Sequence, residues 1–393
     1  MSELFGAAEY AGRLRRTRER MSAQGLDVLV VVEPANLYYL TGYDAWSFYT
    51  PQAVVLGLDG DPLLFTRGID APGALMTTGL AAEQVIGYHD DYVQTPDRHA
   101  FDLLATELRE RVGSGARIGL ERDAYYFSPR AEQALRDGLG GRDDITFADS
   151  GELVNWVRVV KSPTELEAMR RAARIVERVM AVAVDAVKVG VRQCDAAAEM
   201  MRAQARGTEE WGGGYPAIYP MMMSGPETRT AHLMWSDAPF RTGEATVLEL
   251  AAAYRHYHCP MARTAFLGEP PAELRRTSEA VMEGLDAALS AVAPGVRCEQ
   301  VEAAWREAIA RHGLEKPSRV GYSVGIGYPP DWGEHTLSLR PGDRTELAPG
   351  MTFHLMLGMW LGESGLELSE VVHVTETGAE CLASFPHELA VTP

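Results

Sequence analysis

The stretch Glu249–Thr264, with the sequence ELAAAYRHYHCPMART, constrains the fold more than any other part of this chain. It predicts two β-strands joined by a short connection. Glu249 is its one carboxylate, and Arg263 and Thr264 end the second strand. We therefore expect the C-terminal part of the chain to be organised around this hairpin, with Glu249 on its first strand.

A helix start marks the boundary before that part of the chain. In Lys161-Ser-Pro-Thr-Glu165, Ser162 is the expected N-cap, Pro163 the first helical residue, and Glu165 completes a capping box. Apolar residues then recur at helical spacing, at Leu166, Met169, Ala173, Val176, Met180, Ala183 and Val187. This pattern predicts two domains, residues 1–158 and 159–393.

Strands and helices interleave in both domains, which predicts an α/β (α+β) fold. In the first domain we expect helices at 8–24 and 99–112 and strands at 26–32, 53–56, 62–66 and 117–121. In the second we expect helices at 163–187, 193–205, 271–290 and 298–313, and strands at 215–224, 232–237, 245–257, 319–328, 351–360 and 367–375. We find no Gly-rich phosphate loop in this sequence, so nucleotide binding has no support.

Composition limits the class of ligand. The 393 residues include 37 Lys and Arg against 55 Asp and Glu, a net charge of −18, which argues against nucleic acid or an anionic membrane as partner. A small zwitterionic or cationic substrate fits better. We see neither a signal peptide nor an apolar run long enough to span a membrane. The four scattered cysteines predict reduced thiols in a cytoplasmic protein.

Several motifs together resemble the creatinase/prolidase/methionine aminopeptidase superfamily, whose members have a two-domain pita-bread fold. Within it the chain is most similar to the bacterial ectoine hydrolases. The matching stretches are NLYYLTGYDAWSFYTPQ (36–52), YPAIYPMMMSG (215–225), YHCPMARTAFLG (257–268), GYSVGIGYPPDWGE (321–334) and PGMTFH (349–354). The resemblance implies a creatinase-like N-terminal domain, a pita-bread catalytic domain, a homodimer and a small-molecule substrate.

The metal ligands of this superfamily are missing here. Metal-binding relatives use two Asp, one His and two Glu around two hard cations. Their positions correspond to Glu249, Pro260, Tyr322, Met356 and Ser369, with Glu367 and Glu370 close to the last. One carboxylate is left, so we expect no dinuclear metal site and no other cofactor.

The resemblance implies a metal-free mechanism for a cyclic amidine. Once protonated, the amidine carbon is electrophilic, and Glu249 corresponds to the carboxylate that attacks it before water resolves the adduct. His232 lies in a Ser-Gly-x₆-His pattern from Ser224 and corresponds to the acid/base that serves the leaving nitrogen. The product would be N-acetyl-2,4-diaminobutyrate. Alternatively, Glu249 is a residual acid hydrogen-bonded in the sheet, and His232 is a structural histidine that binds a loop.

Six further residues are expected to bind substrate. Trp46, Phe48 and Tyr49 form a candidate aromatic wall for the cation, although an aromatic cluster also suits a core. The remaining candidates are Tyr322, Glu334 and Arg263, of which Arg263 could bind a carboxylate bidentately or serve only the scaffold.

Three other functions stay open. A creatinase-like amidinohydrolase would need two Glu residues at the positions of Ala262 and Met356. An enzyme of a biosynthetic pathway could act on another cyclic amidine or guanidine, because Ala251–Ala253 and Met221–Met223 depart from the ectoine hydrolase pattern. A catalytically inactive binding module would turn over no amidine at all.

Overall fold

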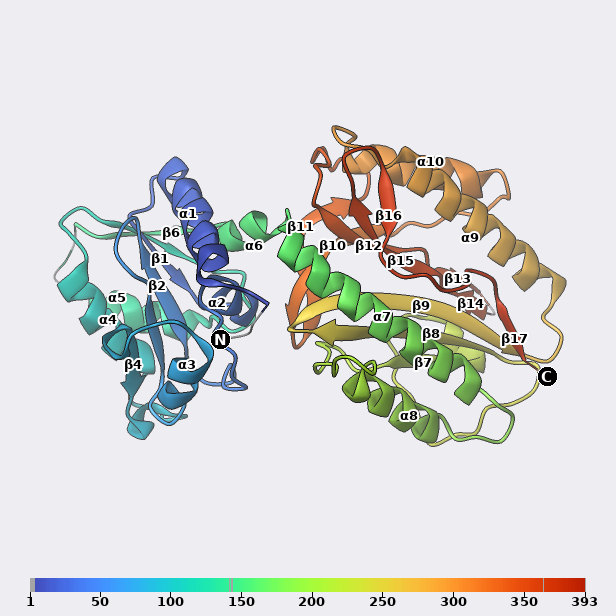
Figure 1. Cartoon of the computed structure of the whole chain (residues 1–393), viewed down its shortest axis with the longest axis horizontal. Coiled ribbons are helices and arrows are strands. Elements are labelled where there is room, and N and C mark those ends of the chain that lie inside the picture. Colours follow the sequence, from blue (N-terminus) through green and yellow to red (C-terminus); the bar gives the residue numbers. More distant parts are fainter. Residues whose placement is uncertain (1–3, 141, 143, 363, 393) are drawn as a thin grey trace. The chain divides into compact units, whose positions relative to one another are not determined.

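The computed structural model of the chain describes residues 4–140, 142, 144–362 and 364–392. These residues form two compact units that divide between Arg158 and Val159 (Figure 1). Among the described residues, no helix is both long and apolar enough to cross a membrane.

The first unit contains a six-stranded sheet with helices around it. Its strands are β1 (Val28–Val31), β2 (Ala53–Gly57), β3 (Leu63–Arg67), β4 (Val85–Tyr88), β5 (Arg117–Leu120) and β6 (Thr146–Asp149). Its helices are α1 (Ala7–Ala23), α2 (Pro34–Thr41), α3 (Ala71–Thr77), α4 (Ala100–Arg111), α5 (Pro129–Gly138) and α6 (Leu153–Arg158), with 3₁₀ turns η1 (Ala82–Gln84) and η2 (Asp90–Tyr92). The strand order is β4-β3-β2-β1-β5-β6.

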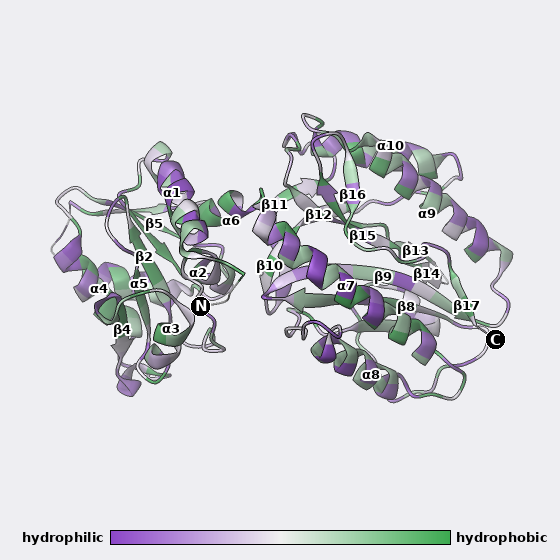
Figure 2. Cartoon of the chain, viewed as in Figure 1, coloured by the Kyte–Doolittle hydropathy of each residue, from purple (hydrophilic) through white to green (hydrophobic). Residues whose placement is uncertain are grey.

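The core of this unit forms where α4 and α5 pack on the sheet. Phe101 and Leu104 of α4 and Leu135 of α5 are buried with Val30 of β1 and Phe65 of β3. Strand β1 pairs antiparallel with β2 and parallel with β5, so the sheet is mixed. Figure 2 shows the central strands of this sheet in the hydrophobic colour, as expected for strands covered by helices.

The described residues of the second unit form a nine-stranded sheet with four long helices. Its helices are α7 (Pro163–Ala186), α8 (Gln193–Arg206), α9 (Ala272–Ala291) and α10 (Cys298–Ala310), with the 3₁₀ turn η3 (Gly225–Arg229). Its strands are β7 (Met221–Ser224), β8 (Ala245–Tyr254), β9 (Tyr257–Leu267), β10 (Gly321–Tyr328), β11 (Asp331–Leu339), β12 (Thr352–Met356), β13 (Met359–Leu361), β14 (Ser364–Leu366), β15 (Ser369–Val374), β16 (Ala379–Cys381) and β17 (Ala390–Thr392).

The strand order puts the predicted hairpin inside this sheet. The path runs β16-β15-β12-β10-β9-β8-β7, with β11 on β10 and β17 on β9, and β13 pairs with β14 in a separate two-stranded sheet. Helix α7 packs along β8 and β9 (Figure 1). Together with the mixed architecture of the first unit, this arrangement confirms the expected α/β fold class.

Helix α7 begins as its sequence predicts. The Ser162 hydroxyl accepts a hydrogen bond from Glu165 N–H at 3.2 Å, and the Glu165 carboxylate accepts one from Ser162 N–H at 2.8 Å. Pro163 occupies the first turn, where no backbone donor is needed. The reciprocal cap fixes where the second unit's first helix starts.

Two expected strands differ in the structure. Residues 215–220 and 232–237 are irregular, and only Met221–Ser224 of the first stretch pairs in the sheet. The second stretch has one backbone hydrogen bond to the sheet, from Met222 N–H of β7 to Leu233 O at 3.2 Å. Its other end is held by a side chain, because Gln193 Oε1, on the first residue of α8, accepts hydrogen bonds from Ser236 N–H at 2.8 Å and from the Ser236 hydroxyl at 3.1 Å.

Candidate active site

The β8–β9 hairpin puts Glu249 in the interior of the sheet. The two residues that connect the strands, Arg255 and His256, both have positive φ values of 51° and 63°, as in the tight turns that suit a twisted hairpin. The register from this turn sets Glu249 opposite Ala262 of β9 and Met221 of β7. Glu249 therefore has a strand on each side.

Glu249 is a buried acid without a hydrogen-bonding partner. It is 4% exposed, and it makes no hydrogen bond or ion pair with any residue that the structure describes. Burial raises its pKa well above the ordinary value of 4.5, and the carboxylates of Glu367 and Asp331 raise that pKa further. A carboxylate in such surroundings either keeps its proton or needs a cationic ligand.

Glu367 is the second unpaired acid of this site, and the sequence pointed to it only as a neighbour of Ser369. Glu367 is 3% exposed, and its Oε2 atom is buried without a hydrogen-bond partner. Burial raises its pKa to about 7, while the charge of Lys316 acts in the opposite direction. Asp331, by contrast, already binds His335 Nε2 at 2.8 Å and Gly333 N–H at 3.0 Å.

Tyr322, which the sequence suggested as a substrate-binding residue, belongs to this neighbourhood. Its hydroxyl accepts a hydrogen bond from Trp332 Nε1–H at 2.8 Å and lies 3.0 Å from His354 Nδ1. Burial raises the Tyr322 pKa, and the charge of Glu249 raises it further, so the phenol stays protonated. Burial also lowers the pKa of His354 to about 3, which keeps this imidazole neutral.

Lys316 is the cation whose charge lowers the pKa of Glu367. Its ammonium donates a hydrogen bond to Gly358 O at 2.7 Å and lies 4.3 Å from the centre of the Trp360 ring. Burial lowers the pKa of Lys316 to about 8, and the Glu367 carboxylate counteracts that shift. At neutral pH the lysine is therefore charged, and its charge favours the ionised form of the neighbouring acid against the effect of burial.

The donors at the five metal positions of the superfamily do not fit a dinuclear metal centre. Those positions are occupied by Glu249, Pro260, Tyr322, Met356 and Ser369. The Ser369 hydroxyl accepts the Ala262 N–H at 2.7 Å, and the Tyr322 hydroxyl is engaged as described above. One carboxylate and no imidazole is a poor set for paired hard cations. Within the described part of the chain, no three His, Cys, Asp or Glu residues are placed to hold a metal ion.

Glu334 is bound within the protein. Its carboxylate lies 2.5 Å from Lys161 Nζ, and both side chains are 1% exposed. Removing one partner of such a pair leaves an uncompensated buried charge, which is strongly destabilising. This contact fits a structural role next to the start of α7 better than the substrate-binding role suggested by the sequence.

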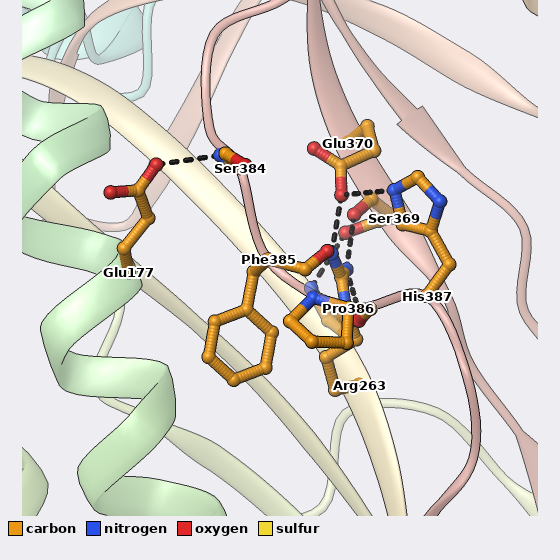
Figure 3. A network of polar contacts seen from close by, with 9 residues as sticks. Glu177, Arg263, Ser369, Glu370, Ser384, Phe385, Pro386 and His387 are labelled. Carbon is orange, nitrogen blue, oxygen red and sulfur yellow. Dashed lines mark hydrogen bonds and ion pairs between the residues drawn. The ribbon is translucent and has the colours of Figure 1, made fainter.

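Arg263 is likewise used by the scaffold, as Figure 3 shows. All three guanidinium nitrogens donate to protein oxygens, at distances of 2.6 to 3.1 Å for the backbone carbonyls. The acceptors are the carbonyls of Ala262, Ser369, Phe385 and Pro386 and the carboxylate of Glu370. Because an arginine has five N–H donors and five bonds are formed, no donor is left for a substrate carboxylate.

His232 lies on the surface of the second unit. It is exposed, has a positive φ of 67°, and makes no hydrogen bond with the described residues. Its neighbour Leu233 accepts a hydrogen bond from Met222 N–H at 3.2 Å, and Met222 adjoins Met221, the residue opposite Glu249. The loop that holds His232 therefore runs beside β7, but no contact joins the imidazole to Glu249.

The three aromatic candidates of the first unit lie in the loop that follows α2. Trp46 and Tyr49 are 56% and 62% exposed, whereas Phe48 is buried. The Trp46 and Phe48 rings are 4.8 Å apart between centroids, and Phe48 also contacts Tyr126 at 5.4 Å. Phe48 thus serves the core of this unit, and the other two rings lie at its surface.

Comparison with known proteins identifies relatives of both units. The metallopeptidase family M24 matches residues 167–376, and the creatinase/prolidase N-terminal domain matches residues 13–160. The chain is 44% identical to the ectoine hydrolase of Halomonas elongata, with 98% of each chain covered, and 45% identical to the uncharacterized hydrolase/peptidase y4tM of Sinorhizobium fredii, again with 98% of each covered. These matches confirm the resemblance that the motifs suggested.

A solved structure shows the same fold. The recombinant prolidase from Thermococcus sibiricus superposes with a TM-score of 0.85 at 21% identity, covering 98% of this chain and 100% of the prolidase. The sequence motifs, the two-unit architecture and these matches lead to one conclusion: the chain belongs to the metallopeptidase family M24 and has a creatinase/prolidase N-terminal domain.

Proposed function

We propose that this protein is a hydrolase of carbon–nitrogen bonds that opens the cyclic amidine ring of ectoine to N-acetyl-2,4-diaminobutyrate. The observation on which this rests is the buried, unpaired carboxylate of Glu249 on a sheet whose other metal positions hold no carboxylate or imidazole. An amidinium cation supplies the charge that such a carboxylate lacks. The 44% identity to an ectoine hydrolase supports the choice of ring.

The chemistry uses Glu249 as the nucleophile. One of its oxygens forms a bond to the amidinium carbon, and the C=N electron pair moves to nitrogen. One C–N bond then breaks as the leaving nitrogen takes a proton and becomes an amine. Water attacks the same carbon, which releases the Glu249 carboxylate and leaves an amide. The net reaction adds one water. Because the protonated amidine carbon is already electrophilic, this mechanism needs no metal to activate it.

The proposal extends to the other residues and properties that the sequence suggested. The assignment of His232 as the proton donor to the leaving nitrogen is supported by its sequence pattern and by the position of its loop beside β7. The surface exposure of Trp46 and Tyr49 is compatible with contact to the substrate cation. Independence from metal, a homodimer and a cytoplasmic location complete the proposal.

The nucleophile is tested with Glu249→Gln. The amide keeps the shape but not the nucleophilic oxygen, so we expect the rate of ectoine opening to fall by at least about 10³-fold. Intact-protein mass spectrometry after an acid quench should show a gain of one ectoine on the wild type and none on the variant. Glu380→Gln, which changes a half-exposed acid on β16, serves as the control. Substantial turnover by Glu249→Gln would remove Glu249 from the nucleophilic role.

A further inference from the structure

Hydrogen bonds hold the backbone of Glu367 against the sheet, beside the position of Glu249. Thr264 of β9 donates its hydroxyl to Glu367 O at 3.0 Å, and Glu367 N–H donates back to the same hydroxyl at 2.8 Å. Thr264 pairs with Val247 of β8, two residues before Glu249. Since cross-strand partners and alternate residues share a face of the sheet, the Thr264 and Glu249 side chains lie on the same face.

A further backbone contact continues this attachment. The Ala262 N–H donates to Ser369 Oγ at 2.7 Å, and Ala262 is the residue opposite Glu249. The segment from Glu367 to Ser369 therefore follows β9 along the positions that flank Glu249. The Glu367 carboxylate is accordingly close enough to raise the pKa of Glu249.

Gly358 and the Trp360 ring hold the Glu367 side chain in place. A Cβ atom added to Gly358 would lie 3.4 Å from Glu367 Oε1 and 2.8 Å from two carbons of the Trp360 ring, so the acid, the glycine and the ring are in close contact. The Lys316 ammonium lies over the same ring and donates a hydrogen bond to the carbonyl of the same glycine. The acid is thus positioned by a glycine and an indole, and its Oε2 atom is left without a protein donor.

When both acids of this cluster are ionised, their charges favour a cationic ligand. The Glu367 carboxylate acts on Glu249, and the charge of Lys316 acts on Glu367. The Lys316 ammonium forms no ion pair with either acid among the described contacts. With both acids ionised, the cluster has one negative charge in excess, which a single cation would neutralise. An unbalanced charge at a buried site is costly, so a monocationic ligand is favoured over a neutral or anionic one.

We propose that Glu367 is a second substrate-binding residue, which accepts an N–H hydrogen bond from an amidinium or guanidinium group while Glu249 faces its central carbon. This inference rests on the proposed function for its choice of cation. It adds the residue that orients the planar cation, because a planar cation needs an acceptor in its own plane as well as an attacking oxygen above it.

The test separates ligand binding from structure. Glu367→Gln removes the charge, is nearly isosteric, and relieves the unliganded protein of a buried acid. We therefore expect the variant to be more stable to heat than the wild type, yet to bind acetamidinium at least about tenfold more weakly in calorimetry at pH 7.5. A carboxylate that only supported the fold would give the opposite result, lower stability with unchanged binding.

Matched variants complete the design. Glu302→Gln changes another buried acid, which pairs with Arg306 on α10, and should leave acetamidinium binding within about twofold of the wild type. Glu367→Asp keeps the charge and should retain binding between that of the wild type and that of Glu367→Gln. It also serves as the second variant if the glutamine does not fold. Equal binding of acetamidinium by the wild type and by both Glu367 variants would overturn the inference.

Two outcomes distinguish this inference from the proposed function. If the wild type binds acetamidinium in a Glu367-dependent way but does not open ectoine, Glu367 keeps its role and the proposed substrate is wrong. If the wild type opens ectoine and Glu367→Gln does so with unchanged kcat and KM, the proposed function stands and the role of Glu367 is wrong. A wild type that binds no acetamidinium and no ectoine would refute the cation site.

Discussion

Glu249 and Glu367 differ from the other buried acids of the second unit in what surrounds them. Glu334 has Lys161, Glu370 has Arg263, and Glu302 has Arg306 as an ion-pair partner. Glu249 and Glu367 have none among the described residues, and the pKa of each is raised by burial. Since a protein keeps such groups at a cost in stability, they are candidates for function, whereas the paired acids are explained by the fold.

The pH dependence of stability should show the cost of Glu367. Burial raises its pKa from the ordinary 4.5 to about 7, with Lys316 acting against the shift, so the folded protein keeps a proton that the unfolded chain loses in this range. The contribution of protonated Glu367 to the free energy of unfolding is complete below about pH 4.5 and is lost as the pH rises through 7. Relative to Glu367→Gln, the free energy of unfolding of the wild type should fall by up to about 1.4 kcal/mol per pH unit between these values.

The comparison with the variant is essential to this measurement. Burial lowers the pKa of His258 to about 4 and that of His354 to about 3, so these groups make the protein more stable as the pH rises toward 6.5. They act equally in both proteins and cancel in the difference. Urea unfolding of the two proteins at pH 5, 6, 7 and 8 gives that difference, and a value independent of pH would contradict the raised pKa of Glu367.

At the scale of elements, Arg263 joins three segments that are distant in sequence. It ties β9 to Ser369 and Glu370 of β15 and to the carbonyls of Phe385 and Pro386 near the end of the chain. His387 Nε2 also lies 3.0 Å from the Glu370 carboxylate (Figure 3). The arginine therefore fixes the segment that leads into β17, which pairs with β9.

Arg263→Lys should reveal this role. Lysine has three donors for five acceptors and cannot reproduce the planar arrangement, so we expect the free energy of unfolding to fall by roughly 2–4 kcal/mol. The KM for ectoine should stay within about twofold of the wild type. Denaturant unfolding and steady-state kinetics measure both quantities, with Arg170→Lys, a half-exposed arginine of α7, as the control. A raised KM with unchanged stability would instead return Arg263 to the substrate-binding residues.

Local patterns predicted the elements that depend on nearby residues. The capping box of Ser162 and Glu165 and the β8–β9 hairpin both appear where the sequence put them, because their hydrogen bonds are local. Residues 232–237 failed as a strand, since the side chain of Gln193, more than 40 positions away, binds Ser236. Strand β11 was missed, although its residues follow the expected β10 directly.

The site was predictable only in part, for the same reason. Glu249 and Tyr322 could be named from motifs, since each stands at a position that binds metal in relatives. Glu367 stands at no such position, and its place beside Glu249 depends on the hydroxyl of Thr264, about 100 residues earlier. The partners of Arg263 and Glu334 are equally distant in sequence, so their use by the scaffold could not be read from local spacing.

At the scale of the whole molecule, the chain keeps the family's architecture and changes the chemistry of its centre. The M24 family and creatinase/prolidase matches cover most of the chain, and a prolidase shares its fold at a TM-score of 0.85. The metal positions hold one acid, and the additional acid, Glu367, comes from a position between β14 and β15. We infer that substrate charge takes the place of the metal as the partner of the buried carboxylates.

Metal-free opening of a cyclic amidine is best examined by measuring turnover of ectoine by the purified protein with and without a strong chelator. Mass spectrometry of the product should show a gain of one water, and its fragments should match N-acetyl-2,4-diaminobutyrate. We expect the same rate in both samples. Activity that the chelator abolishes, or no turnover of ectoine by the folded protein, would contradict it.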